Sequence, residues 1–314
     1  MLKNNYINFN KALKPVLIGY AIVIVIGIVL TAVFGMNVDI NFKGGTRISY
    51  TYTGEVDLAK ASKTVEGALA QTATVTSGSA LNGGSKQLVI SLAGNSSIAA
   101  DKQEALTKAL TTDYKDNNFE LYDSNSVSPT IAGSFFIKSL VAVIIAGVFV
   151  VIFVGFRFKN IGGVRAALTA YVALILDCIV AFLACCALRL PIDSNLMAVI
   201  LTLLGYSLND TIVIYDRVRE NKKLYPQKEL AELVDESINS VKTRTFITTV
   251  TTVLAVITII VVSEIFGLST LRSFAIPMTF GLVSGCISSM FVAAPLWVIW
   301  RKAADKRASK KKAK

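Results

Sequence analysis

Long, uninterrupted runs of apolar residues dominate this chain and are separated by short polar segments. Each run is close to the roughly 20 residues that a helix needs to cross a bilayer. The apolar residues fall on all sides of each run, which is expected of a helix surrounded by lipid. The sequence therefore predicts six transmembrane helices, at Pro15–Val38, Ser139–Phe156, Ala166–Leu188, Ser194–Tyr215, Thr245–Ser263 and Ser273–Trp300.

The first apolar run follows a positively charged flank, as the apolar core of a signal peptide does. The run is longer than a typical signal core, and no clear small-x-small cleavage site precedes Asp39. We therefore expect residues 15–36 to be an uncleaved membrane anchor that follows a short cytoplasmic segment, residues 1–14.

Between the first and second runs lies a polar segment, residues 37–130, that is long enough for a small domain. The alternation at Arg47–Thr53 predicts a strand with Ile48, Tyr50 and Tyr52 on one face. The whole segment reads strand, helix, strand, strand, helix, strand, which is the split βαβ or ferredoxin-like pattern. The other predicted elements are a helix at Asp57–Ala70, strands at Thr72–Ser77 and Gln87–Leu92 around a turn at Leu81–Ser85, a helix at Ile98–Leu110 and a strand from Asn118 toward Val127.

The charges predict the orientation. The net charge is +11, yet residues 37–130 hold eight basic and ten acidic residues. The excess of lysine and arginine falls in the loops that share a side with the N-terminus, so the positive-inside rule places both termini in the cytoplasm and residues 37–130 outside. Attraction of the basic loops to anionic lipid accounts for this pattern. Contact with an acidic partner or with ribosomal RNA is the alternative explanation. Because lipid attraction suffices, we expect no nucleic-acid partner. The basic tail, residues 301–314, is predicted to be disordered.

The residue types that are missing exclude several functions. The chain has no histidine, which removes histidine-based metal sites, nucleophile activation and proton shuttles. Its four cysteines all lie in predicted spans without a CxxC pair, so we expect neither a disulfide framework nor a metal site. No GxSxG elbow is present. We therefore expect no catalytic residues, no cofactor and no enzymatic activity.

Two aspartates interrupt the apolar runs, Asp177 in the third and Asp210 in the fourth. An ionisable group within a bilayer costs about 2.5 to 3.5 kcal/mol on insertion scales, and such groups are usually functional or paired. Burial disfavours the charged form, which would suit reversible protonation. A structural carboxylate paired with a neighbouring helix is the alternative for both residues.

The surroundings of Asp210 are polar. Gly205 and Ser207 precede it on the same helix and are small enough for close helix approach. Arg244, at the start of the fifth span, is either an interfacial anchor or a counter-ion for Asp210. The threonines that follow it, Thr245, Thr248, Thr249, Thr251 and Thr252, give this span a polar side that serves helix packing or lines a hydrated path.

Three segments resemble the SecF branch of the SecD/SecF family, which belongs to the RND superfamily. They are Val38–Thr46, with a family Asp-Phe-x-Gly-Gly-Thr motif, the long segment Gly205–Asn221, and Ser237–Asn239 with Thr243–Thr245. Asp177 also falls where the family has an aspartate in its third span. One departure is Asn41, which stands where many relatives have aspartate, and Lys43 follows Phe42. The Gly44–Gly45 pair remains as a backbone position suited to a tight turn.

The resemblance implies an RND-type half of six transmembrane helices, 131–300 holding spans two to six, with one extracytoplasmic domain. It implies a multi-pass protein of the bacterial inner membrane that works with SecD and the SecYEG channel on a translocating preprotein. By the same resemblance, Asp210 is the proton-responsive carboxylate, Arg244 is its electrostatic partner, and Asp177 and Asn209 support the proton path. The alternatives are an RND-type small-molecule or lipid transporter subunit and a passive membrane scaffold; an intramembrane enzyme is a weaker one.

Overall fold

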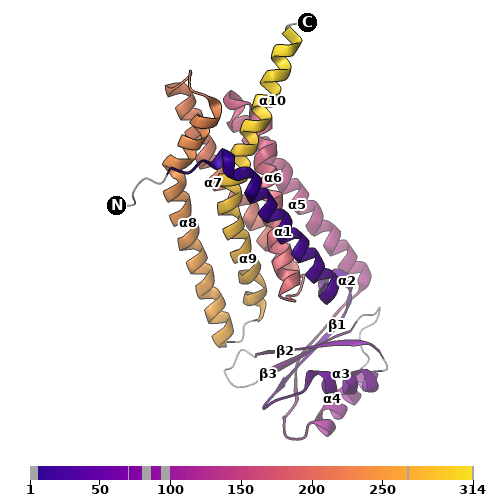
Figure 1. Cartoon of the computed structure of the whole chain (residues 1–314). Helices are drawn as coiled ribbons and strands as arrows, with labels where there is room; N and C mark the ends of the chain where they lie inside the picture. Colours follow the sequence, from indigo (N-terminus) through magenta and orange to yellow (C-terminus); the bar gives the residue numbers. More distant parts are fainter. Residues whose placement is uncertain (1–5, 70, 80–85, 93–99, 267–268, 313–314) are drawn as a thin grey trace.

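The computed structural model describes residues 6–69, 71–79, 86–92, 100–266 and 269–312. Within these ranges six helices are long and apolar enough to cross a membrane, and they pack into one bundle, as the apolar runs predicted (Figure 1). The first five are α1 (Phe9–Phe34), α5 (Pro129–Arg157), α6 (Gly163–Ala187), α7 (Ser194–Leu224) and α8 (Leu230–Phe266). A 3-10 turn, η1 (Lys159–Ile161), links α5 to α6.

The sixth span is one continuous helical path made of α9 (Ser269–Ser288), a π-helical turn η2 (Ser289–Ala293) and α10 (Ala294–Lys312). The disorder predicted for the basic tail is wrong as far as Lys312, because α10 continues through it. The span has already nucleated the helix, so extension needs no new nucleus. Alanine, lysine and arginine favour helix, and Arg301 forms an ion pair with Asp305 one turn further on.

The segment between α1 and α5 forms a four-stranded antiparallel sheet covered by two helices. Its order is α2 (Ile40–Lys43), β1 (Gly45–Tyr52), α3 (Leu58–Leu69), β2 (Ala73–Ser79), β3 (Lys86–Leu92), α4 (Ala100–Asp113) and β4 (Glu120–Val127). The strands lie in the order β2-β3-β1-β4, and all three pairings are antiparallel. The predicted sequence of strands and helices is therefore confirmed, while the predicted turn at Leu81–Ser85 lies outside the described residues.

The core of this domain lies between the sheet and its two helices. Ile48, Tyr50 and Tyr52 are buried, as the alternation along β1 predicted. They pack with Leu88 and Ile90 of β3 and with apolar residues of both helices. The polar positions of β1 face the other way, so the domain has one packed face and one polar face.

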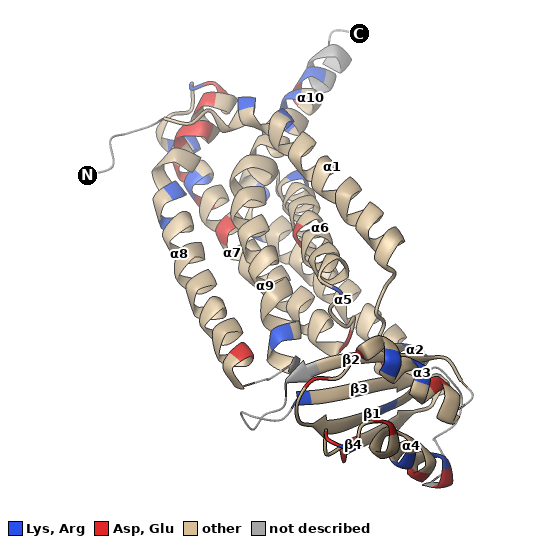
Figure 2. Cartoon of the chain, turned by 60° about the horizontal axis from the view of Figure 1, so that its bottom comes forward, with Lys and Arg blue, Asp and Glu red and all other residues tan. Residues whose placement is uncertain are grey.

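The sheet domain lies at one end of the bundle, and both chain termini lie at the opposite end (Figure 1). Charged residues gather at the two ends of the bundle and over the sheet domain, and the stretch between them has few (Figure 2). This distribution is the one that a lipid-embedded bundle requires, because charge is expensive within hydrocarbon.

A short β-bridge ties the sheet domain to the bundle. Val38 pairs with Ile192 in the loop before α7. The Asp39 amide donates to the Ile192 carbonyl at 3.1 Å, and the Ile192 amide donates to the Asn37 carbonyl at 2.8 Å. Phe42 of α2 also packs against Phe135 and Phe136 of α5. The domain is therefore anchored on the loop before α7 and on α5, besides the helix that leads into it.

Candidate functional site

Asp210 lies on the buried side of α7 with only 4% of its surface exposed. Among the described residues its carboxylate forms no hydrogen bond and no ion pair. The positive charge of Arg244, on α8, acts on it through space. A buried carboxylate without a hydrogen-bond donor has nothing to hold it in its charged form except a neighbouring charge. This arrangement suits a group that exchanges a proton.

Two threonines of α8 extend this polar region. The hydroxyls of Thr245 and Thr249 are buried and have no hydrogen-bond partner among the described residues. Cys286 of α9 lies within interaction range of both Thr249 and Asp210. The hydroxyls of Thr248, Thr251 and Thr252 instead donate to carbonyls of their own helix, and Thr252 also accepts from Tyr206 of α7 at 2.8 Å. The threonine side of α8 therefore divides into packing positions and unsatisfied buried hydroxyls.

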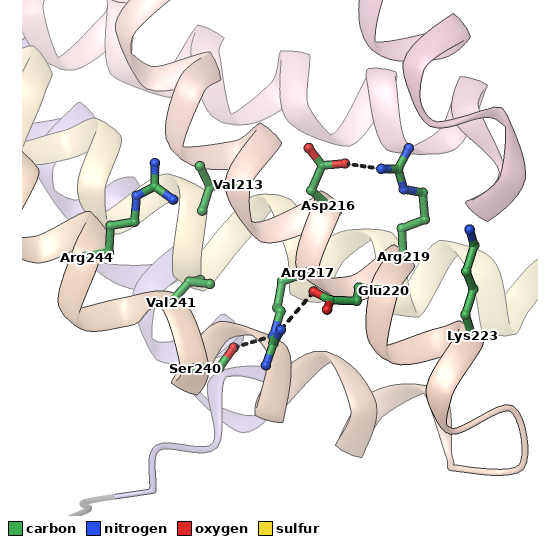
Figure 3. A pocket seen from close by; sticks show the side chains of 9 residues that line it. All are labelled: Val213, Asp216, Arg217, Arg219, Glu220, Lys223, Ser240, Val241 and Arg244. Carbon is green, nitrogen blue, oxygen red and sulfur yellow. Dashed lines mark hydrogen bonds and ion pairs between the residues drawn. The ribbon is translucent and has the colours of Figure 1, made fainter.

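Arg244 also lines a pocket of about 840 Å³ between α7 and α8, at the end of the bundle that holds the termini. Figure 3 shows the nine lining residues, four of them basic and two acidic. Asp216 pairs with Arg219 at 2.9 Å and Glu220 with Arg217 at 2.8 Å. Arg244 makes no such pair with the other lining residues. It is therefore a cation on the wall of a pocket, and its charge acts on Asp210 inside the bundle.

Asp177 of α6 is fully buried and, unlike Asp210, its carboxylate has three hydrogen-bond donors. Its Oδ1 accepts from the Ser284 hydroxyl at 2.7 Å. Its Oδ2 accepts from the Ser207 hydroxyl at 2.6 Å and from the Ser288 hydroxyl at 2.9 Å. Hydrogen bonds to an ionised acceptor are short and strong. The two intramembrane carboxylates thus have opposite environments. Asp177 accepts three hydrogen bonds, and Asp210 accepts none among the described residues.

Two further predicted residues lie on an exposed side of α7. Asn209 and Gly205 are both exposed in this chain. A Cβ added at Gly205 would meet no atom within 4 Å, so the close helix approach expected there is not made to another helix of this chain. Close approaches to α7 are made instead by α9, at Gly281, where a Cβ would lie 2.3 Å from the Leu203 side chain, and at Gly285, where it would lie 2.9 Å from the Ser207 hydroxyl.

The Gly44–Gly45 pair forms the turn between α2 and β1. Gly44 has φ +76° and Gly45 φ +130°, in a region that side chains other than glycine rarely adopt. A Cβ on Gly45 would lie 2.2 Å from the Leu92 carbonyl oxygen, and one on Gly44 would lie 2.6 Å from Pro129. Glycine is required here by both the backbone angles and the space.

The motif segments on α7 and α8 hold the two helices together near the pocket. The Asn221 amide donates to the Ser237 hydroxyl at 2.8 Å, and both residues are buried. Asn239 exchanges hydrogen bonds with the backbone of Ile7, at 3.1 and 2.8 Å. Deeper in the bundle, the Tyr215 hydroxyl hydrogen-bonds Thr169 at 2.8 Å. These residues fix α7 against α8, α6 and the N-terminal segment.

The junction between bundle and sheet domain contains a second group of charges. Asp39, buried, pairs with Arg47 of β1. Asp193 caps α7 by accepting from the amides of Asn195 and Leu196, at 2.9 and 3.3 Å. Burial raises the pKa of Asp193, against the opposing effect of these bonds and of Arg47. Burial likewise lowers the pKa of Arg47, against the charge of Asp193.

Sequence reasoning missed four residues of the intramembrane network: Tyr20, Ser284, Gly285 and Ser288. A signal for them exists, because Ser284 and Ser288 are one helical turn apart in an apolar span with a glycine between them. The sequence does not show which carboxylate Ser284 and Ser288 bind, since they lie 107 and 111 residues from Asp177 along the chain.

The fold and the site define a class: a membrane protein with six spans, one small domain at one end of the bundle and carboxylates within the membrane. Residues 106–303 match the C-terminal family of protein export membrane proteins SecD/SecF. The chain belongs to this family. The predicted resemblance is therefore confirmed.

The similar proteins place the chain on the SecF side of the SecD/SecF family. The chain is 31% identical to the protein translocase subunit SecF of Alicyclobacillus acidocaldarius, covering 91% of this chain and 90% of the relative. It is 31% identical to the subunit SecDF of Bacillus subtilis over 94% of its own length but only 38% of the relative. The crystal structure of SecDF from Thermus thermophilus, a translocon-associated membrane protein, superposes with a TM-score of 0.81 at 25% identity, covering 96% of this chain and 40% of that one. The chain is a SecF-like translocase subunit of a bacterial membrane.

Proposed function

We propose that this SecF-like subunit works with SecD beside the SecYEG channel and uses the proton gradient to promote export of preproteins. The observation that carries the proposal is Asp210, a buried carboxylate without a hydrogen-bond donor among the described residues, within the electrostatic reach of Arg244. Asp210 takes up and releases the proton, and Arg244 stabilises its charged form. Thr245 and Thr249 offer hydroxyls to a hydrated path. Asp177 and Asn209 support that path.

The orientation is part of the proposal. Both termini are cytoplasmic, and the sheet domain lies on the outer side. Basic residues concentrate at the end of the bundle that holds the termini, including four that line the pocket at Arg244. The positive-inside rule places this end in the cytoplasm. The outer domain, residues 37–130, has the strand order expected of a ferredoxin-like fold, and it is the part that meets the emerging chain.

SecD is the proposed partner within the membrane. In the Bacillus subtilis and Thermus thermophilus relatives a single chain contains both parts, and this chain matches about 40% of it. Asn209 and Gly205 are exposed on α7 at the depth of the apolar core. A side-chain amide facing lipid is unfavourable, and a glycine permits close approach of a second helix. This side of α7 therefore suits a SecD helix.

The membrane potential supplies enough energy per proton to shift a conformational equilibrium of this protein. One elementary charge that crosses 100 mV is worth about 2.3 kcal/mol. That shifts a two-state equilibrium by about fiftyfold, since each 1.4 kcal/mol is tenfold. A proton that reaches Asp210 from outside and leaves toward the cytoplasm would bias the outer domain between two arrangements.

The test is export in inside-out vesicles that contain the complete complex, with and without a proton gradient. We expect Asp210→Asn to abolish the gradient-dependent part of export, because the neutral amide cannot exchange a proton. Glu264→Gln is the matched control: this carboxylate pairs with Arg272 near the end of the bundle next to the sheet domain and should be dispensable. Immunoblots check that the subunit and SecD remain assembled.

If Asp210→Asn complexes assemble and keep their gradient dependence, the proton site is not in this chain. The protein would then be a passive scaffold for SecD. Because a scaffold tolerates a neutral side chain at this position, this outcome would reject the proton-driven mechanism.

A further inference from the structure

The Asp177 network joins three transmembrane helices at one buried point. Ser207 reaches Asp177 from α7, and Ser284 and Ser288 reach it from α9. Every member is at most 5% exposed. With three hydroxyl donors on two oxygens, the carboxylate is fixed in position and satisfied. We call Asp177, Ser207, Ser284 and Ser288 the serine knot.

Tyr20 joins a fourth helix, α1, to this buried point. The Tyr20 hydroxyl of α1 lies 3.0 Å from the Ser284 carbonyl oxygen and 3.0 Å from the Ser284 hydroxyl. Most of α1 is exposed in this chain, and its buried residues are only Phe9, Leu13, Tyr20 and Gly27. Tyr20 is thus a polar contact, deep in the bundle, of the helix that leads directly into the sheet domain.

The knot is also close to the proposed proton site. Ser207 lies three residues before Asp210, so both side chains project from adjacent turns on one side of α7. Gly285 allows this packing, since a Cβ there would lie 2.9 Å from the Ser207 hydroxyl and 3.5 Å from the Asp177 carboxylate. The π-helical turn η2 begins directly after Ser288, and π-helical turns within α-helices occur often at functional sites.

We propose that Asp177 is a positioning residue whose serine knot couples α7, which carries Asp210, to α1, which leads to the outer domain. A rearrangement of α7 that follows proton exchange is transmitted through Ser207, Asp177, Ser284 and Tyr20 to α1. The inference rests on the proposed function. It gives Asp177 a mechanical role, because its oxygens are closed by donors, whereas those of Asp210 are not.

The decisive variant is Tyr20→Phe, which removes one hydroxyl and keeps the aromatic ring. In the vesicle assay we expect gradient-dependent export to fall about fivefold, the effect of one buried hydrogen bond of ordinary strength. The pH midpoint of the remaining gradient-dependent export should not change, because Asp210 is untouched. Tyr171→Phe is the matched control, since the Tyr171 hydroxyl of α6 has no hydrogen bond among the described residues.

Substitutions at Asp177 add a graded series. Asp177→Asn keeps one acceptor oxygen for the serines and should retain part of the coupling, while Asp177→Ala should lose it. If Asp177→Ala fails to assemble, Tyr20→Phe and Asp177→Asn still test whether the serine knot couples α7 to α1.

The outcomes separate the two proposals. Gradient-dependent export that Asp210→Asn leaves intact overturns the proposed function, and with it the coupling. Gradient-dependent export that requires Asp210 but is equal in Tyr20→Phe and Tyr171→Phe overturns the coupling alone. A changed pH midpoint in Tyr20→Phe also overturns it, because Tyr20 would then act on the proton site itself.

Discussion

At the scale of single residues, the junction shows how one carboxylate serves several contacts. Asp39 accepts from the Asn41 amide nitrogens of backbone and side chain, at 2.9 and 2.7 Å, and also pairs with Arg47. The departure that the sequence showed at Asn41 has a physical reason here. Its side chain donates to Asp39, and an aspartate at this position would bring a second negative charge without a donor. The amide thus keeps the Asp39–Arg47 pair intact.

The pH dependence of the junction follows from Asp193. Its pKa in the folded protein is raised above the ordinary value of 3.8, mainly by burial. The folded state therefore takes up a proton at a higher pH than the unfolded state, so the contribution of Asp193 to stability falls as the pH rises through the raised pKa. We expect Asp193→Asn, which keeps a capping oxygen, to be more stable than wild type at pH 7. The difference should shrink as the pH falls toward 3.8.

Thermal unfolding of the whole protein in detergent micelles, at several pH values, measures this difference. Asp193→Ala is the control, because it also removes the charge but loses the cap of α7, and it should be less stable than Asp193→Asn by about 1 kcal/mol at every pH. Lower stability of Asp193→Asn at pH 7 would mean that attraction to Arg47 outweighs burial.

At the scale of elements, the turn between α2 and β1 sets the direction in which the sheet leaves the membrane. Gly44 and Gly45 occupy positive φ values, and Leu92 of β3 closes over Gly45. The carbonyl oxygen of Leu92 belongs to the strand that pairs with β1, so it cannot move without breaking the sheet. The turn is therefore a rigid connection and not a flexible linker.

Gly45→Ala should destabilise the sheet domain by about 2 kcal/mol or more, since it combines a disfavoured backbone conformation with a clash. Gly67→Ala in α3 is the matched control: a Cβ there meets nothing within 4 Å, and alanine favours helix by up to about 1 kcal/mol over glycine. Hydrogen exchange of the sheet residues in the full-length protein measures both. Equal protection in Gly45→Ala and wild type would contradict the rigid turn.

At the scale of the whole molecule, the bundle is buried unevenly. In the most apolar stretch of α6, half of the residues are buried within the chain. In the corresponding stretches of α8 and α1, only 17% and 11% of the residues are buried. Among the more exposed surfaces, the Gly205–Asn209 side of α7 has a polar amide and a position without a side chain. These two features favour a protein partner over lipid at this surface.

Gly205→Leu should reduce the amount of SecD that co-purifies with this subunit by about tenfold, because a bulky side chain in a packed interface costs about 1 to 3 kcal/mol. Gly19→Leu on α1 is the control, since Gly19 is also exposed and a Cβ added there would meet no atom within 4 Å. Affinity purification of SecD from solubilised membranes gives the comparison. Equal recovery of SecD with both variants would place the interface elsewhere.

The sequence by itself determined the number of spans, the order of elements in the sheet domain and the exceptional status of Asp177 and Asp210. These properties are local: an apolar run of sufficient length is a helix in lipid, alternation fixes the buried face of β1, and a carboxylate in hydrocarbon is expensive wherever it lies. The glycine pair that forms the turn into β1 was local in the same sense.

Only the tertiary structure decided what surrounds each intramembrane carboxylate. Asp177 and Asp210 look alike along the chain, but the donors that close Asp177 lie 30, 107 and 111 residues away. The close helix contacts fell at Gly281 and Gly285 and not at Gly205 for the same reason. The helical tail depended on a helix that the span had already nucleated. Hydrogen bonds and clashes depend on distances that packing alone sets, so no pattern of neighbouring residues contains them.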